Sequence, residues 1–245
     1  MSMVRLKKIL LGSLLALYFP MMLGLVGSHR QDVVCSEVVV DVMDSMKTRF
    51  VSDTEIRDAV LEKFSETLGE PLNTLNFNHI EAFVEKHPAI KNCEVYNTVG
   101  GYLKIDLVQH LPLFRVFENT RSYYIDEDGN EMPLFDSFTA RVLVASGAIE
   151  GEMENLLFIS RFLRDNAFWS AQIEQLYIKE DGDYVLVPRV GDHLILLGPP
   201  DRFEEKMRNL EALYKKGLSP REWNNYQMIN LKYEGQVLCS KNRNI

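Results

Sequence analysis

Alternating apolar and polar positions near the end of the chain predict a half-buried strand. Residues 228–241 read MINLKYEGQVLCSK, in which the apolar side chains of one parity are Ile229, Leu231, Tyr233, Val237 and Cys239. Side chains of one parity lie on one face of a strand. The pattern therefore predicts a single strand over 228–240 whose odd-numbered side chains pack on a core, with Gly235 as a bulge. Only a few residues follow, so we expect one side of this strand to be an open sheet edge.

The region between residues 33 and 110 predicts the order β-α-α-β-β. VVCSEVVVDVM is β-branched and strand-like. SDTEIRDAVLEKF begins with a capping box made by Ser52 and Glu55, and it predicts a helix with Ile56 and Val60 facing inward. NHIEAFVEKHP predicts a second helix that buries Ile80, Phe83 and Val84. AIKNCEVY and YLKIDLVQ predict two strands joined by the turn NTVGG. This order is typical of a compact two-layer α+β unit.

Beyond Pro112 the pattern predicts a second, strand-rich domain. LFRVFEN and SYYIDEDGNEMPLF indicate strands, and residues 151–167 a helix. IEQLYIKEDGDYVLVPRVGDHLILLG predicts a three-stranded meander, and a helix is predicted from Pro200 to Gly217. We therefore expect an α+β fold with one domain at 29–111 and a mixed, largely antiparallel β domain at 112–245.

The first residues differ from the rest. Arg5, Lys7 and Lys8 precede the uncharged stretch 9–27, ILLGSLLALYFPMMLGLVG. As a helix this stretch is about 28 Å long, close to the ~30 Å hydrocarbon core of a bilayer. It predicts a transmembrane helix at 9–28 with a cytoplasmic head at 1–8 and the later domains outside. A cleaved signal peptide is the rival interpretation, but no A-x-A site follows Gly27.

Composition and charge narrow the class of function. The chain has 245 residues and a formal net charge of −8 without a basic patch, which argues against binding nucleic acid. Its three cysteines are too few for a disulfide framework, and Cys93 and Cys239 occupy apolar positions typical of small core residues.

The sequence contains few candidates for a catalytic or metal-binding motif. The acidic turn DEDGNE, Asp126 to Glu131, lacks the glycine and glutamate spacing of a calcium loop, so a hairpin turn is the better interpretation. The five histidines show no zinc-helix spacing, and the chain has no nucleophile elbow, P-loop or dinucleotide fingerprint. We expect a non-enzymatic protein with no cofactor and no metal.

The order and spacing of several segments resemble the bacterial cell-division family FtsQ/DivIB. FVSDTEIRDAVLEKF, HPAIKNCEVY and LKIDLVQHLPLFRVF are similar to a POTRA domain, which precedes the family's β domain. YYIDEDGNEMPL, HLILLGPPDRFEEKMRNLEAL and YQMINLKYEGQVLCS are similar to segments of that β domain. Asn230 departs from the family pattern, which usually has Asp there, and His110 stands where an acidic or polar residue is common.

The resemblance implies a single-pass inner-membrane scaffold of the division machinery, with its C-terminal domains in the periplasm. It implies binding of FtsB/FtsL-like coiled-coil proteins through the β domain, and recruitment of other division components through the POTRA domain. We expect such binding to occur by strand addition, in which an extended partner segment pairs with the exposed edge of a sheet. The partner-binding residues in this hypothesis are Lys232, Tyr233, Glu234, Gly235, Gln236, Val237 and Leu238.

Two points stay open from the sequence. The first is Tyr233, whose side chain points inward by strand parity but is a contact residue by the resemblance. The second is the terminal strand edge, which is either a partner site or an edge kept soluble by its charges. Another class of POTRA-containing envelope protein, from outer-membrane assembly or secretion, is the alternative function, and a membrane-tethered envelope enzyme comes third.

Overall fold

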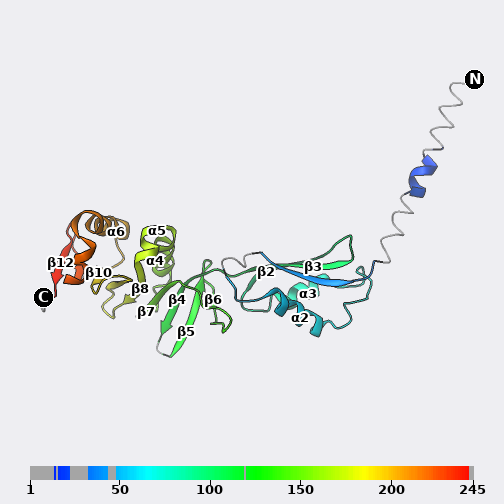
Figure 1. Ribbon diagram of the computed structural model, residues 1–245, viewed down its shortest axis with the longest axis horizontal. Helices are drawn as coiled ribbons and strands as arrows, with labels where there is room; N and C mark the ends of the chain where they lie inside the picture. The colour runs from blue at the N-terminus through cyan, green and yellow to red at the C-terminus, as the bar shows by residue number, and fades with distance from the viewer. Residues whose placement is uncertain (1–13, 15, 23–32, 44–47, 119, 243–245) are drawn as a thin grey trace, which may run out of the picture. The chain divides into compact units, whose positions relative to one another are not determined.

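The computed structural model describes residues 14, 16–22, 33–43, 48–118 and 120–242 (Figure 1). Most of them fall into two compact units, one made of residues 33–43 and 51–109 and the other of 48–50 and 110–242. The cytoplasmic head predicted at 1–8 and most of the predicted span lie outside the described residues. Within the span, residues 14 and 16–22 are helical. No helix among the described residues has the length and apolar character needed to cross a bilayer.

The first unit is a three-stranded sheet with two helices. Its elements in chain order are β1 (Glu37–Val42), α2 (Asp53–Lys63), α3 (Phe77–Val84), β2 (Ile90–Asn97) and β3 (Tyr102–Gln109). The strand order is β1-β3-β2, with β1 parallel and β2 antiparallel to β3. The predicted order β-α-α-β-β is therefore confirmed.

Local sequence signals explain the helix starts of this unit. The Ser52 side chain accepts a hydrogen bond from the backbone N–H of Glu55, and Asn76 caps α3 in the same way through the N–H of His79. Ile56, Val60, Ile80 and Val84 are buried against the sheet. Phe83, expected to be buried, is only half-buried; its ring packs edge-on against Phe64, the C-cap residue of α2.

The second unit is built on a nine-stranded mixed sheet. Its first strands are β4 (Pro112–Glu118), β5 (Arg121–Asp126), β6 (Glu131–Met132) and β7 (Leu143–Gly147), followed by the helices α4 (Met153–Asp165) and α5 (Ala167–Gln172). Then come β8 (Ile173–Ile178), β9 (Tyr184–Pro188), β10 (Leu194–Gly198), α6 (Phe203–Ala212), β11 (Tyr226–Asn230) and β12 (Leu238–Lys241). The sheet order is β12-β11-β10-β9-β8-β7-β4-β5-β6, and β8, β9 and β10 form the predicted antiparallel meander.

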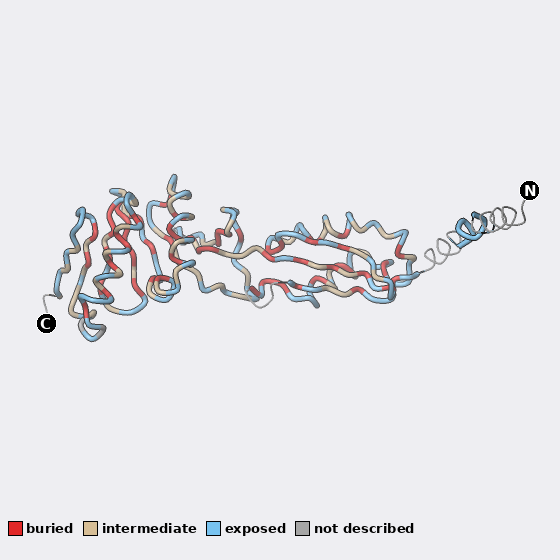
Figure 2. The backbone as a smooth tube through the Cα atoms, turned by 90° about the horizontal axis from the view of Figure 1, so that it is seen from above, coloured by how far each residue is buried: buried red, intermediate tan, exposed pale blue. Residues whose placement is uncertain are grey.

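The core of the second unit lies on one face of this sheet. A cross-strand row of fully buried side chains runs along that face: Val116, Ala145, Leu176, Leu186, Ile195 and Ile229. Apolar residues of α4 and α6, among them Ile159 and Met207, belong to the same cluster. Figure 1 shows α4, α5 and α6 on that side. Figure 2 shows the buried stretches following the strands of the unit.

The end of the chain departs from the prediction of one strand over 228–240. The structure has two strands, β11 and β12, which pair antiparallel with Ile229 opposite Cys239. Because both opposed residues are odd-numbered, the apolar alternation continues in phase across the turn and gives no sign of it in the sequence. Gly235 lies in this turn at φ +65° and is not a bulge.

Candidate partner-binding edge

The terminal hairpin lies at one edge of the nine-stranded sheet. β11 runs parallel to β10, with Ile195 opposite Ile229, and the segment containing α6 makes the connection that parallel strands require. β12 folds back along the other side of β11 and is the last strand in the sheet order. A partner strand would therefore meet β12, and not β11 as the single-strand prediction implied.

The hydrogen-bond pattern identifies the backbone groups that face outward from β12. The N–H of Leu231 donates to Leu196 O at 2.8 Å, so from Met228 onward the odd-numbered residues face β10 and the even-numbered ones face β12; the pairing with β12 shifts by one residue between Tyr226 and Met228. Leu238 lies opposite Asn230, and the N–H of Asn242 donates back to Asn225 O at 2.8 Å. The backbone groups of Cys239 and Lys241 consequently point away from the sheet, and Val237 has the same parity just before β12.

The turn between β11 and β12 is set by a few local bonds. Asn230 Oδ1 accepts a hydrogen bond from the N–H of Lys232 at 2.9 Å, an Asx-type bond that ends β11. The N–H of Gln236 donates to Tyr233 O at 3.2 Å. Gly235 between them has φ +65°, a left-handed conformation that side chains other than glycine rarely adopt. Asn230 thus has a structural role in this turn, one that the family's usual Asp could also fill because the bond needs only a side-chain oxygen.

Lys232 ties this turn to the body of the sheet. Its Nζ lies 2.7 Å and 2.9 Å from the two carboxylate oxygens of Asp183, whose side chain is only 7% exposed. Its aliphatic part lies on Gly198, where an added Cβ would come within 2.9 Å of Lys232 Cγ and the backbone has φ +74°. The lysine therefore anchors the turn from within the domain, and its predicted role as a partner contact stays a prediction.

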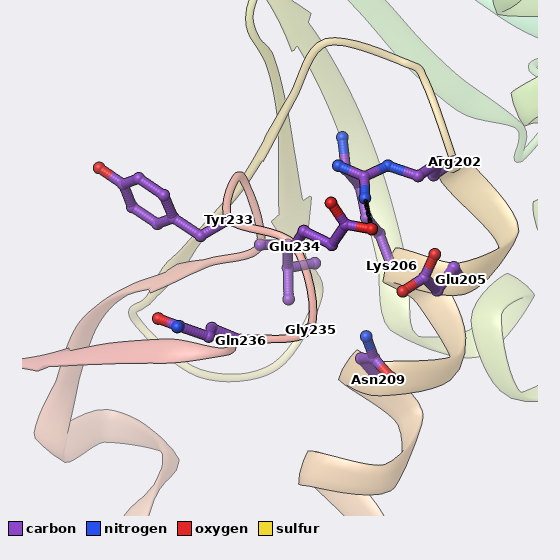
Figure 3. Close-up of a pocket in the computed structure, with 9 residues that line it drawn as sticks. Arg202, Glu205, Lys206, Asn209, Tyr233, Glu234, Gly235 and Gln236 are labelled. Carbon is purple, nitrogen blue, oxygen red and sulfur yellow. Dashed lines mark ion pairs between the residues drawn. The ribbon is translucent and has the colours of Figure 1, made fainter.

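Glu234 holds the turn against the start of α6. It forms an ion pair of 2.7 Å with Arg202, the residue before α6, which has the unusual φ of 49°. Figure 3 shows these two side chains meeting over a small pocket that Glu205, Lys206 and Asn209 of α6 also line. Both partners are exposed, so this pair stabilises the turn only weakly.

Tyr233 is exposed, which corrects the inward orientation expected from parity. Its side chain is 55% exposed and points away from α6 in Figure 3, because residue 233 belongs to the turn and strand alternation does not apply to it. Leu238, 46% exposed, lies on the face of the sheet opposite the core. Val237 and Cys239 pack partly against the core, and Gln236 is exposed in the turn. The structure therefore brings the seven predicted residues together in one hairpin but divides them between anchoring and exposed roles.

The acidic turn that resembled a calcium loop is a closed hairpin between β5 and β6. The buried carboxylate of Asp126 accepts bonds from the N–H groups of Asp128 and Asn130, and its Oδ2 lies 2.6 Å from His110 Nδ1. Burial raises the pKa of Asp126, but the hydrogen bonds from Asn130 and His110 outweigh it and hold that pKa below its ordinary value. Across the part of the chain that the structure describes, no cluster of His, Cys, Asp or Glu could hold a metal ion.

Sequence reasoning missed the three residues that fix the hairpin from outside it, Asp183, Gly198 and Arg202. Asp183 follows a turn glycine and reads as an ordinary turn residue. Its partner is far along the chain, and no local pattern marks that distant pairing. Gly198 offered a weak signal, since a glycine at the end of a strand often marks a close approach of other atoms.

Comparison with known families covers almost all of the described chain. Residues 33–108 match a POTRA-like domain, and residues 111–240, more than half of the chain, match the family model described as FtsQ/DivIB, C-terminal related. No curated protein matches the sequence significantly. The second match runs from the start of β4 into β12, ending at residue 240, and so includes nearly all of the terminal hairpin. The chain belongs to the FtsQ/DivIB C-terminal related family and carries a POTRA-like domain ahead of that region.

Proposed function

We propose that this protein is a non-enzymatic, membrane-anchored scaffold of the bacterial division machinery that accepts a partner strand at β12. The observation that carries the proposal is the outer edge of β12, with which no other strand of the described residues pairs. Among the described residues, no side chain or backbone carbonyl accepts a hydrogen bond from the outward N–H groups of Val237 or Cys239. Family membership supports the setting, and it disfavours outer-membrane assembly or secretion as the alternative.

An FtsB/FtsL-like protein is the partner we propose for this edge. Backbone bonds to Val237, Cys239 and Lys241 would supply the pairing, as in other cases of strand addition. Exposed Tyr233 and Leu238 flank the edge and are the apolar contacts, since aromatic residues are frequent binding hot spots. Lys232, Glu234 and Gly235 act indirectly in this proposal, because they shape the turn.

The anchor and the location are part of the same proposal. We propose that residues 9–28 form an inner-membrane helix with the N-terminus in the cytoplasm and both described units in the periplasm. The uncharged stretch and the basic residues before it support this orientation. Recruitment of further division components by the POTRA-like domain remains a proposal drawn from the family.

A proline at position 239 tests the edge. Cys239→Pro removes one outward N–H and leaves the β11–β12 hydrogen bonds in place, since proline is tolerated on an edge strand. Cys239→Ala is the matched control, because it removes the thiol and keeps the N–H. Binding of the FtsB-like partner's ectodomain to the full chain, measured by biolayer interferometry, should weaken at least about tenfold in Cys239→Pro.

The control should bind within about threefold of the original chain, a change of less than ~1 kcal/mol. Circular dichroism and the melting temperature check that both variants are folded. If folded Cys239→Pro binds with unchanged affinity, the partner does not pair with this edge and the proposed mode of binding is wrong.

A further inference from the structure

The POTRA-like sheet has an antiparallel edge of its own at β2. β2 pairs with β3 on one side and is the last strand in the order β1-β3-β2. The N–H of Thr98 donates to Tyr102 O, so even-numbered residues at this end of the hairpin face β3. The backbone groups of Cys93 and Val95 therefore face outward, as the groups of Cys239 do in β12.

Two carboxylates, one in α3 and one in its C-terminal cap, accept hydrogen bonds from those outward donors. Glu81 Oε1 accepts a hydrogen bond from the N–H of Val95 at 2.8 Å, and Glu85 Oε1 accepts one from the N–H of Cys93 at 3.3 Å. The bonds join side chains of a helix and its C-terminal cap to alternate residues of a strand that runs the opposite way. Hydrogen bonds to a carboxylate are stronger than those between neutral groups.

The spacing of the two elements makes this double contact possible. Four helical residues advance about 6 Å along a helix axis. Two residues of a strand advance about 6.7 Å. Glu81 and Glu85, four residues apart, can therefore reach Val95 and Cys93, two residues apart, when the helix lies along the strand and runs the opposite way. Buried Ile80 and Val84 hold α3 in that place.

We propose that Glu81 and Glu85 form a latch that closes the β2 edge to strand addition. A strand added there would have to offer carbonyl groups to the N–H groups of Cys93 and Val95, and both are already bonded to a carboxylate. The outward N–H groups of Val237 and Cys239 carry no such cap among the described residues. The latch directs an incoming strand to β12, and contacts made by the POTRA-like domain use a surface other than this edge.

Amide hydrogen exchange on the full chain tests the latch. In Glu81→Ala/Glu85→Ala the N–H groups of Cys93 and Val95 should exchange at least about tenfold faster, because they lose their acceptors. The N–H groups of Glu94 and Tyr96, which face β3, should change less than about threefold. The matched control is Glu62→Ala/Glu66→Ala, which removes two exposed glutamates at the same spacing and should leave all four amides unchanged.

A second variant distinguishes loss of the two hydrogen bonds from loss of the fold. Glu81→Gln/Glu85→Gln keeps an oxygen acceptor at each position, so it should retain most of the protection of Cys93 and Val95. A fluorescent peptide with the sequence of residues 90–97 then probes the edge. It should bind the double alanine variant and leave the unmodified chain unbound.

Two results would overturn the proposal. One is rapid exchange of the Cys93 and Val95 amides in the unmodified chain, which would mean that the latch is open in solution. The other is equal binding of the peptide to the unmodified chain and the double alanine variant. Neither result bears on β12, so failure of the latch and failure of the proposed partner edge are distinguishable.

Discussion

Lys232 illustrates how a residue can hold in place the turn of a proposed binding edge through contacts inside its own domain. Sequence parity placed it outward on an edge strand, where a lysine is a natural contact or a protection against aggregation. The structure instead joins it to the buried carboxylate of Asp183 and lays its aliphatic part on Gly198. The residue type and the exposed position were predictable, but the partner was not, because Asp183 lies on a different turn.

Replacing this lysine tests its role as an anchor of the turn. Lys232→Met keeps the aliphatic part and leaves Asp183 buried without its ionic partner, so we expect a loss of about 1–3 kcal/mol in the free energy of unfolding. Lys232→Met/Asp183→Asn should recover part of that loss. Lys216→Met, at an exposed position, is the control and should change little. Urea unfolding of the four chains gives the comparison, and an unchanged midpoint for Lys232→Met would contradict the anchoring role.

At the scale of elements, most of the helices and strands could be predicted from local pattern. Capping residues located α2, and turn glycines located the meander β8–β9–β10. The terminal hairpin could not be predicted, since its two strands keep the same apolar phase. The bonds from β2 to Glu81 and Glu85 could not be predicted either, because these two glutamates look in the sequence like ordinary solvent-facing residues of a helix.

The β5–β6 hairpin provides a prediction about pH. The folded-state pKa of Asp126 lies below its ordinary value of 3.8, so the ionised carboxylate stabilises the fold above that pH. The contribution is lost as the pH falls through the lower folded-state pKa. We expect the melting temperature of Asp126→Asn to lie below that of the original chain at neutral pH, and the gap to narrow below about pH 4. A gap that stays constant down to about pH 2 would rule out this linkage.

At the scale of the whole molecule, the sequence indicated two domains because each segment carries its own apolar pattern. The structure contains two units with separate buried cores, and the division falls between Gln109 and His110. Strand order within the second unit was beyond prediction, since β7 pairs with β4 and β8 through contacts distant in sequence. The edge at β12 follows from that order, which is why the candidate site could be located from sequence but not described.

The proposed anchor makes a prediction about the mass of the membrane-extracted 245-residue chain. If residues 9–28 stay in the membrane, the protein extracted with detergent should have the intact mass of the full sequence, about 28.3 kDa. The length of the uncharged stretch and the lack of an A-x-A site support retention. A mature form that begins near Ser28 would identify the stretch as a cleaved signal, and the scaffold would then need another tether.

The in-phase pairing of Ile229 with Cys239 has a consequence for reading related sequences. An insertion or deletion of one residue in the turn, with the same pairing kept, would shift the apolar positions of β12 to the other parity. The interruption would then reveal the hairpin in the sequence alone. An insertion of two residues would hide it again. Relatives whose turns differ by an odd number of residues are therefore the ones from which this edge can be recognised without a structure.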